Sequence, residues 1–345
     1  MKNALTALWL AFLASIPLWM ANPYVLHILV VTGIFIVAAM SLNLLLGYAG
    51  QLSLGHVAFF GVGAYTSALV SLGFSAQIAP GMVAAMDPKP VWSAMAAAIL
   101  VAGAFGWFIG KLAFKVRGAY FVIVSISFAE VVRLVAVNWV ELTQGPMALN
   151  NIPPLTLWLP GLGEHAFWKK PENYWLVLAV AVISYIVIRR LVHSRAGRAM
   201  IALRENEPLA TSVGIDVTRY LVLTTVVSAA IAGAAGALYA HYVRIVDPDV
   251  FLFIYTVTMV IMVVTGGKGT LAGPIVGGLI FGLLPETLRA FAIKPEAQWI
   301  VYGVLMVMVV YFLPEGIVPA ACQWWQRRQA SVAAAAAASP SRPAQ

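Results

Sequence analysis

Charged residues and cysteine are scarce in this sequence. Asp, Glu, Lys and Arg make up only 10% of its 345 residues, whereas hydrophobic residues make up 62% and the mean hydropathy is +0.90. Because a soluble domain has roughly 25% charged residues, this composition excludes an ordinary soluble globular protein. The single cysteine, Cys322, excludes a disulfide bond within the chain.

Motifs for catalysis and metal binding are also missing. The stretch TGGKGT at 265–270 resembles a phosphate-binding loop, but Gly269 follows Lys268 where that loop requires Ser or Thr. No nucleophile elbow and no pair of catalytic carboxylates occurs, and the histidines lie in separate segments without metal-ligand spacing. We therefore expect no enzyme activity, no metal site and no cofactor bound by this chain.

Apolar runs, in contrast, recur along almost the whole chain. A helix needs about 20 mainly apolar residues to cross a bilayer, and the polar–apolar alternation of an outer-membrane barrel is absent. We predict an all-α fold, a polytopic bundle of about ten transmembrane helices. The predicted spans are residues 4–20, 24–46, 57–74, 91–110, 118–137, 174–191, 219–240, 251–266, 270–290 and 297–313. The first is expected to be a retained span and not a cleaved signal peptide.

Basic residues gather in alternate loops, so the net charge of +8 indicates topology and not nucleic-acid binding. With the N-terminus in the cytoplasm, the inner segments hold Lys111, Lys115, Arg117, Arg189, Arg190, Arg195, Arg198, Arg204, Arg327, Arg328 and Arg342. The opposite loops hold chiefly Lys89, Lys169, Lys170, Arg244 and Lys294. Because Lys and Arg are enriched in cytoplasmic loops, both termini are predicted to be cytoplasmic.

The chain is expected to form one membrane domain over residues 1–321. Residues 138–173 are predicted to be an ordered or interfacial external loop, and residues 192–218 are predicted to be the main internal loop. Residues 322–345, rich in Ala and Pro, are predicted to be a disordered cytoplasmic tail.

Two glycine-rich stretches interrupt the apolar runs. GYAGQLSLG at 47–55 and GGKGTLAGP at 266–274 share the spacing of two glycines and a leucine. Duplicated halves with interrupted or re-entrant helices are common in transporters, where they point to the substrate path. The alternative is that two glycine-rich turns agree by chance.

The internal loop contains signals for two short helices. Ser194 is expected to cap the first and Asn206 or Glu207 the second, with Pro208 in its first turn and Gly214 at its end. Leu209 and Val213 lie one turn apart and form a small apolar knob, flanked by Arg204, Glu205 and Glu207. Such a surface suits docking of a soluble partner, although a solvated basic loop that serves topology alone is the alternative.

Several long motifs occur in an order that carries a family resemblance. SLNLLLGYAGQLSLGHVAFFGVGAY, GRAMIALRENEPLATSVGID, AGALYAHYV, MVVTGGKGTLAGPIVGG, LLPETLR and LPEGI closely resemble the LivM-type permease subunits of branched-chain amino acid ABC importers, over about residues 30–317. Two places depart from the family pattern, at Pro208 and in the external stretch LTQGPMALNNIPP.

The resemblance implies a bacterial inner-membrane subunit with specific partners. These are a sister permease, two cytoplasmic ATPases that use ATP and Mg, and a periplasmic binding protein that delivers leucine, isoleucine or valine. It also implies that the internal loop couples to an ATPase, with Ala210 and Gly214 at matching positions. The implied coupling residues are Arg204, Glu205, Asn206, Glu207, Pro208, Leu209, Ala210, Val213 and Gly214.

With this resemblance, the glycine-rich stretches gain an interpretation as part of the translocation path. Irregular backbone at membrane depth survives only where protein or trapped water satisfies its polar groups. The candidate path residues are Asn43, Gly47, Gly50, Gln51, Ser53, His56, Thr265 and Gly266. The alternative is a tight cytoplasmic turn that only helps helices to pack.

Glu130 and Arg133 are oppositely charged and lie inside one predicted span. Each costs about 2.5–3.5 kcal/mol at mid-bilayer, and at a separation of three residues they can pair on a helix. We expect this pair to fix the orientation of its helix toward the bundle.

Other functions stay open at this point. Permeases of the same family for urea, short-chain amides or other amino acids would share these motifs. An ATP-independent secondary transporter would need acidic residues or ion sites within the membrane, for which Glu130 is the main candidate. A non-transporting membrane scaffold would have little use for the glycine-rich breaks.

Overall fold

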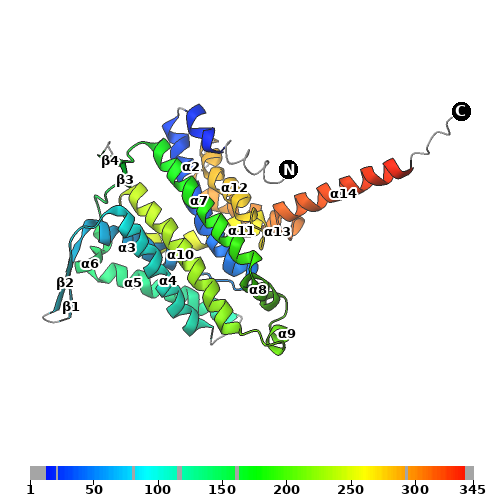
Figure 1. Cartoon of the computed structure of the whole chain (residues 1–345). Helices are drawn as coiled ribbons and strands as arrows, with labels where there is room; N and C mark the ends of the chain where they lie inside the picture. Colours follow the sequence, from blue (N-terminus) through cyan, green and yellow to red (C-terminus); the bar gives the residue numbers. More distant parts are fainter. Residues whose placement is uncertain are drawn as a thin grey trace.

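A computed structural model shows a helical bundle from which the C-terminal helix projects (Figure 1). It describes residues 13–20, 22–79, 82–114, 119–159, 163–291 and 294–338. Lys115, Arg117 and Arg342, which contribute to the predicted topology, and the first part of the predicted span 4–20 lie outside the described residues.

Each predicted span overlaps a helix among the residues that the structure describes. Residues 13–19 are helical, and the long helices that follow are α2 (Pro23–Asn43), α3 (Val57–Leu72), α4 (Val91–Ala113), α5 (Ala119–Asn138), α7 (Lys170–His193), α10 (Val217–Val243), α11 (Phe253–Gly266), α12 (Gly273–Ala290), α13 (Pro295–Phe312) and α14 (Ile317–Ala338). Shorter helical elements are η1 (Leu44–Tyr48), α6 (Val140–Thr143), η2 (Gly145–Met147), α8 (Arg195–Glu205), α9 (Glu207–Ser212) and η3 (Pro248–Phe251). The fold is therefore that of an all-α polytopic membrane protein.

Length separates these helices into two groups. Within the described residues, five helical stretches are long and apolar enough to cross a membrane: 23–48, 91–113, 120–138, 170–193 and 217–243. The apolar helices 57–72, 253–266 and 300–309 are shorter. The predicted count of about ten spans stays a prediction, because short helices can be re-entrant as well as spanning.

Helix α10 forms the centre of the bundle and packs against α2, α3 and α4. Small residues allow the close approach, as expected for helices that associate in a membrane. A Cβ atom at Gly63 would lie 2.3 Å from the carbonyl oxygen of Gly233, and one at Gly236 would lie 1.9 Å from that of Phe60. Larger side chains at these positions would push α3 and α10 apart.

Two short hairpins lie in loops outside the bundle. Strands β1 (Phe74–Ala79) and β2 (Met82–Met86) pair antiparallel with Phe74 opposite Met86. Strands β3 (Thr156–Leu159) and β4 (Gly163–Ala166) pair antiparallel with Thr156 opposite Ala166. The second hairpin belongs to the loop 138–173, of which the structure describes residues 138–159 and 163–173.

The C-terminal segment differs from its predicted state. Disorder is expected from residue 322 onward, but α14 continues as a helix to Ala338 and leads away from the bundle (Figure 1). The run of alanines in this segment has the highest intrinsic helix propensity, so low complexity does not imply an irregular chain here. The division into a membrane domain and a tail stays a prediction.

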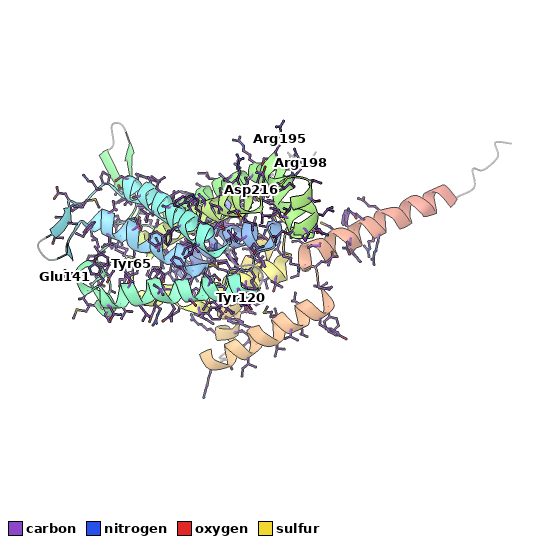
Figure 2. The ribbon with its side chains drawn as sticks, turned by 90° about the horizontal axis from the view of Figure 1, so that it is seen from below. Tyr65, Tyr120, Glu141, Arg195, Arg198 and Asp216 are labelled. Atoms are coloured by element: carbon purple, nitrogen blue, oxygen red, sulfur yellow. The ribbon has the colours of Figure 1, made fainter. Side chains whose placement is uncertain are left out.

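The bundle has two distinct ends. Figure 2 shows Arg195, Arg198 and Asp216 together near α8, whereas Glu141 lies at the end that carries β1 and β2. Tyr120 marks the start of α5, which runs toward Glu141. The α8–α9 loop and the 138–173 loop therefore lie at opposite ends of the bundle.

Candidate coupling and translocation site

The α8–α9 loop is built from the predicted capping residues. Ser194 caps α8, where its side chain accepts a hydrogen bond from the backbone N–H of Gly197. Asn206 caps α9 by accepting from Leu209 N, and Asp216 caps α10 by accepting from Arg219 N. Gly214, with φ of +87°, ends the short helix. Each cap satisfies a backbone donor that the helix leaves without a partner.

Helix α9 presents two apolar side chains away from the bundle. Leu209 is 63% exposed and Val213 is 72% exposed, while Ala210 between them is only 4% exposed and holds α9 against the protein. Glu205, Asn206 and Pro208 are exposed around this pair, and Glu207 is half-buried. We call Leu209 and Val213 the α9 knob. Its form is that of a small apolar contact with a charged rim, which suits a soluble partner.

The first glycine-rich stretch interrupts the chain between α2 and α3. Helix α2 widens into the π-helix η1, and residues 49–53 are then irregular before α3 begins at Val57. Gly50 has φ of +72°, a conformation that glycine adopts without strain. A π-helical turn inside a helix often marks a functional position.

The second glycine-rich stretch interrupts the chain between α11 and α12 and touches the first. Asn43 joins them, because its side chain accepts from Gly269 N at 2.9 Å and donates to Thr270 O at 2.8 Å. A Cβ atom at Gly47 would lie 2.2 Å from Gly269 N. The predicted similarity of the two stretches thus corresponds to a direct contact, which we call the glycine junction (Asn43, Gly47, Gly50, Gly269 and Thr270).

Arg204 connects the α8–α9 loop to the glycine junction. Its Nη1 atom donates a hydrogen bond of 2.6 Å to the carbonyl oxygen of Gly47, 157 residues away in the sequence. Its side chain also forms an ion pair with Glu205 and passes Gly50, where a Cβ atom would lie 2.8 Å from Cγ of Arg204. The last turn of α8 is therefore attached to the point where α2 is interrupted.

Other predicted path residues are buried away from this contact. His56 is fully buried, and its Nε2 atom shares a hydrogen bond of 2.7 Å with Ser41 Oγ. Ser228 donates to Ser41 O at 2.5 Å, which ties α2, α10 and the start of α3 together. The structure thus gives His56 a packing role, and its assignment to the translocation path stays a prediction.

Ser53, Thr265, Gly266 and Gln51 occupy different surroundings. Ser53 and Thr265 are buried, and Thr265 Oγ1 has no hydrogen-bond partner within the part of the chain that the structure describes. Gly266 packs against Gly273, where a Cβ atom would lie 1.8 Å from the carbonyl oxygen. The Gln51 N–H donates to Leu45 O and closes the end of η1.

Two anchoring side chains were missed by reasoning from the sequence. Ser125 Oγ accepts from the backbone N–H groups of Leu54 and Gly55, and Thr256 Oγ1 accepts from that of Val57. These bonds satisfy backbone donors of the irregular stretch, which cannot remain without partners inside a membrane. Neither residue has a local signal in the sequence, because both lie on distant apolar helices.

The predicted contact between Glu130 and Arg133 is present. Arg133 Nη1 donates to Glu130 Oε1 at 3.0 Å, and Arg133 Nη2 lies 3.8 Å from Asp249 Oδ1 in η3. The second contact, which the sequence did not predict, joins α5 to η3. No group of three or more His, Cys, Asp or Glu residues that could hold a metal ion occurs within the described residues.

Comparison with known proteins places these features in a family. The model of the family described as branched-chain amino acid transport system / permease component matches residues 24–310. The chain belongs to this family of transport permeases. The match includes the α8–α9 loop and both glycine-rich stretches.

Relatives of the permease include both members of a named pair. It is 32% identical to the high-affinity branched-chain amino acid transport system permease protein LivM of Salmonella typhimurium, over 84% of this chain and 68% of the relative. It is 30% identical to LivM of Escherichia coli, over 87% of this chain and 71% of the relative. It is 29% identical to LivH of Salmonella typhimurium, over 81% of this chain and 89% of the relative. No solved structure matches the permease.

Proposed function

We propose that this permease is the membrane-spanning subunit of an ATP-driven importer for leucine, isoleucine and valine. A binding protein delivers the amino acid, separate ATPase subunits supply the energy, and a sister permease completes the path. The match to relatives named as branched-chain amino acid permeases supports the substrate class. Matches to both LivM and LivH support a pair of permeases.

One observation carries the mechanism: Arg204 bonds Gly47 from the end of the helix that precedes the α9 knob. An ATPase that binds Leu209 and Val213 can therefore change the position of the glycine junction through Arg204. Coupling of this kind requires an element with two arrangements, one of which the partner favours. An interrupted helix is such an element, because its irregular residues lack a continuous ladder of helical hydrogen bonds.

The buried residues support an ATP-driven importer more than a transporter driven by an ion gradient. The buried polar side chains of the described residues are those of Thr, Ser, Asn and His, without an acid among them. Acidic residues within the membrane are the usual sites at which a gradient-driven transporter takes up and releases ions. Glu130, the candidate from the sequence, has a side chain that is 54% exposed.

Orientation follows from the same proposal. The ATPases are cytoplasmic, so α8 and α9 face the cytoplasm and the 138–173 loop faces the binding protein. Arg189, Arg190, Arg195 and Arg198 at the α8 end agree with the enrichment of basic residues in cytoplasmic loops.

The test is ATP-driven uptake by the complex reconstituted in liposomes with its ATPases, sister permease and binding protein. Truncating the α9 knob in a Leu209→Ala/Val213→Ala variant removes exposed apolar contacts, so we expect the ATPases to bind at least about tenfold more weakly. Thr211→Ala, on the same helix, is the matched control and should bind as the wild type. Uptake that persists without ATPase subunits would overturn the proposal. Competition of radiolabelled leucine with isoleucine, valine, urea and short amides identifies the substrate class.

A further inference from the structure

A cavity of about 280 Å³ lies at the end of the bundle opposite α8 and α9. It is bounded by the start of α2, the start of α7 and the end of α10. Because α7 has 24 residues, this end is about 36 Å from the α8–α9 loop along the helix axis. The cavity is therefore separate from the glycine junction. The lining residues are His27, Pro154, Phe167, Trp168, Lys170, Asn173, His241, Tyr242, Val243 and Arg244.

The charge of this cavity suits an anion. Arg244 and Lys170 line it, and none of the described lining residues is acidic. The Nε atom of Arg244 donates to Ile152 O at 3.0 Å, which fixes the guanidinium while Nη1 and Nη2 have no partner among the described residues. Arg244 also lies over the ring of Trp168, at 4.7 Å from its centroid. Planar guanidinium groups held in this way are well suited to binding phosphate.

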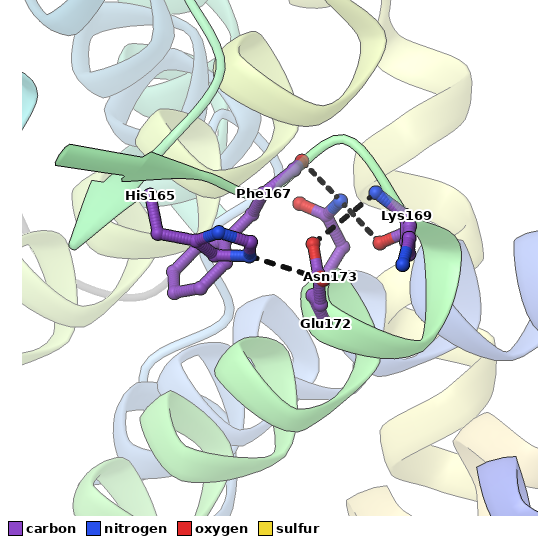
Figure 3. A network of polar contacts seen from close by, with 5 residues as sticks. All are labelled: His165, Phe167, Lys169, Glu172 and Asn173. Carbon is purple, nitrogen blue, oxygen red and sulfur yellow. Dashed lines mark hydrogen bonds and ion pairs between the residues drawn. The ribbon is translucent and has the colours of Figure 1, made fainter. Parts of the chain in front are cut away.

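The walls of the cavity are held in place by a polar network at the start of α7 (Figure 3). Asn173 Nδ2 donates to Phe167 O at 2.9 Å and to Lys169 O at 3.1 Å. The nearby carboxylate of Glu172 is engaged by His165 and by the backbone N–H of Lys169. Glu172 thus caps the helix, and it is not among the residues that line the cavity.

Exposed aromatic residues place the cavity at the level of lipid headgroups. Trp168 is 64% exposed, and Trp19, Tyr24 and Trp175 are also exposed at this end. Trp and Tyr are enriched where a membrane protein meets the membrane–water interface. At this level the cavity presents two cationic side chains, Lys170 and Arg244. It also presents the apolar surfaces of Phe167 and Val243.

We propose that this cavity binds the phosphate of an anionic phospholipid headgroup. Arg244 and Lys170 hold the phosphate, and Phe167, Trp168 and Val243 contact the apolar part of the lipid. An amino acid substrate fits less well, because its ammonium group would face Arg244 and Lys170 while none of the described lining residues is acidic. The bound lipid joins α2, α7 and α10 at the end where the hydrogen bond between His27 Nδ1 and Tyr242 Oη already links two of them.

The test is native mass spectrometry of the purified, delipidated full-length chain with added dioleoyl-phosphatidylglycerol or dioleoylglycerol. We expect the wild type to retain the phosphatidylglycerol at least about tenfold better than dioleoylglycerol, because each nearby cation favours an anionic headgroup. A Lys170→Gln/Arg244→Asn variant should lose this preference; Asn tolerates the positive φ of residue 244. Lys169→Gln, which removes a charge one residue outside the cavity, is the matched control and should retain it.

Competition distinguishes the possible sources of the anion. Retention that survives excess inorganic phosphate and excess leucine supports a lipid site. Displacement of the lipid by either of them overturns the proposal, as does equal retention of dioleoylglycerol. Equal loss in Lys169→Gln and in the double variant also overturns it. If the double variant fails to fold, Lys170→Gln alone and the wild-type headgroup comparison decide the question.

Discussion

Arg204 lies in the last turn of α8 and joins two parts of the chain that are distant in sequence. Its hydrogen bond to Gly47 O crosses from the predicted coupling loop to the interrupted end of α2. A guanidinium can hold Glu205 and a carbonyl oxygen together, since it has several donors in a fixed plane. A lysine has one ammonium group and cannot reproduce this geometry.

We expect Arg204→Gln to lower ATP-driven uptake by about tenfold, the equivalent of one charge-assisted hydrogen bond. ATPase binding should stay intact, because the α9 knob is unchanged. Uptake by the reconstituted complex and co-purification of the ATPases with the permease measure the two effects separately. Arg198→Gln, on the exposed side of α8, serves as the control. A proportional loss of uptake and ATPase binding in Arg204→Gln would contradict a transmitting role.

Gly47 gives a second prediction at the scale of single residues. In Gly47→Ala the added methyl group would lie 2.2 Å from both Asn43 Oδ1 and Gly269 N, so the glycine junction must separate. We expect a loss of about 1–3 kcal/mol in stability, seen as a lower melting temperature in detergent, together with reduced uptake. Gly303→Ala should melt at or above the wild-type temperature, because nothing lies within 4 Å of its Cβ position. Equal melting of the two variants would refute the close contact.

Local residue roles could be predicted from the sequence, whereas distant contacts could not. Ser194, Asn206 and Gly214 act where their residue types favour helix ends, since capping depends on neighbours in the chain. Arg204 was predicted as part of the charged rim and of the coupling loop, but not as a partner of Gly47. Its bond to Gly47 depends on how α2 and α8 meet in space, and no nearby residue signals it.

At the scale of elements, helix α9 is short and depends on its cap. Asn206→Ala removes the acceptor for Leu209 N, which costs about 0.5–2 kcal/mol of local stability. Amides 207–213 should therefore exchange hydrogen about fivefold faster, as measured by mass spectrometry. Thr218→Ala, in the first turn of α10, should leave this exchange unchanged. Unaltered exchange in Asn206→Ala would show that contacts with the bundle alone hold α9.

Helix α5 is joined to η3 through Arg133. We expect Arg133→Gln to lower both assembly and uptake more than Glu130→Ala, because it removes the contacts to Glu130 and to Asp249 together. The effect on stability should be small, about 0.2–1 kcal/mol, since these side chains are partly exposed. Yield of the purified complex and uptake rate measure the two effects. A larger loss of assembly and uptake in Glu130→Ala than in Arg133→Gln would contradict this prediction and would assign the joining role to Glu130.

The elements were predicted with uneven success. Long apolar runs predicted the helices well, because crossing or entering a bilayer demands a continuous stretch of apolar residues. The hairpin of β1 and β2 was not predicted, since residues 74–86 contain Ala, Gly and Pro with weak alternation. Helix α14 was missed because its alanines were interpreted as low complexity and not as helix formers.

At the scale of the whole molecule, the single thiol tests the proposed orientation. Cys322 is exposed in α14, and it should react with a membrane-impermeant maleimide in inside-out vesicles but not in right-side-out vesicles. In a Cys322→Ser background, Lys89→Cys should show the reverse pattern, because Lys89 lies at the opposite end. Labelling of Cys322 from outside the cell would show that the protein has the opposite orientation, which would contradict the coupling proposal.

The contact between Gly47 and Gly269 restricts how the molecule can change shape. The backbones of Gly47 and Gly269 lie close together, and Asn43 forms hydrogen bonds with Gly269 and Thr270. These contacts oppose sliding of the C-terminal end of α2 past the segment that precedes α12. We therefore expect them to move together as one unit, so that rearrangement during transport takes place around this unit, in the irregular residues 49–53 that follow it.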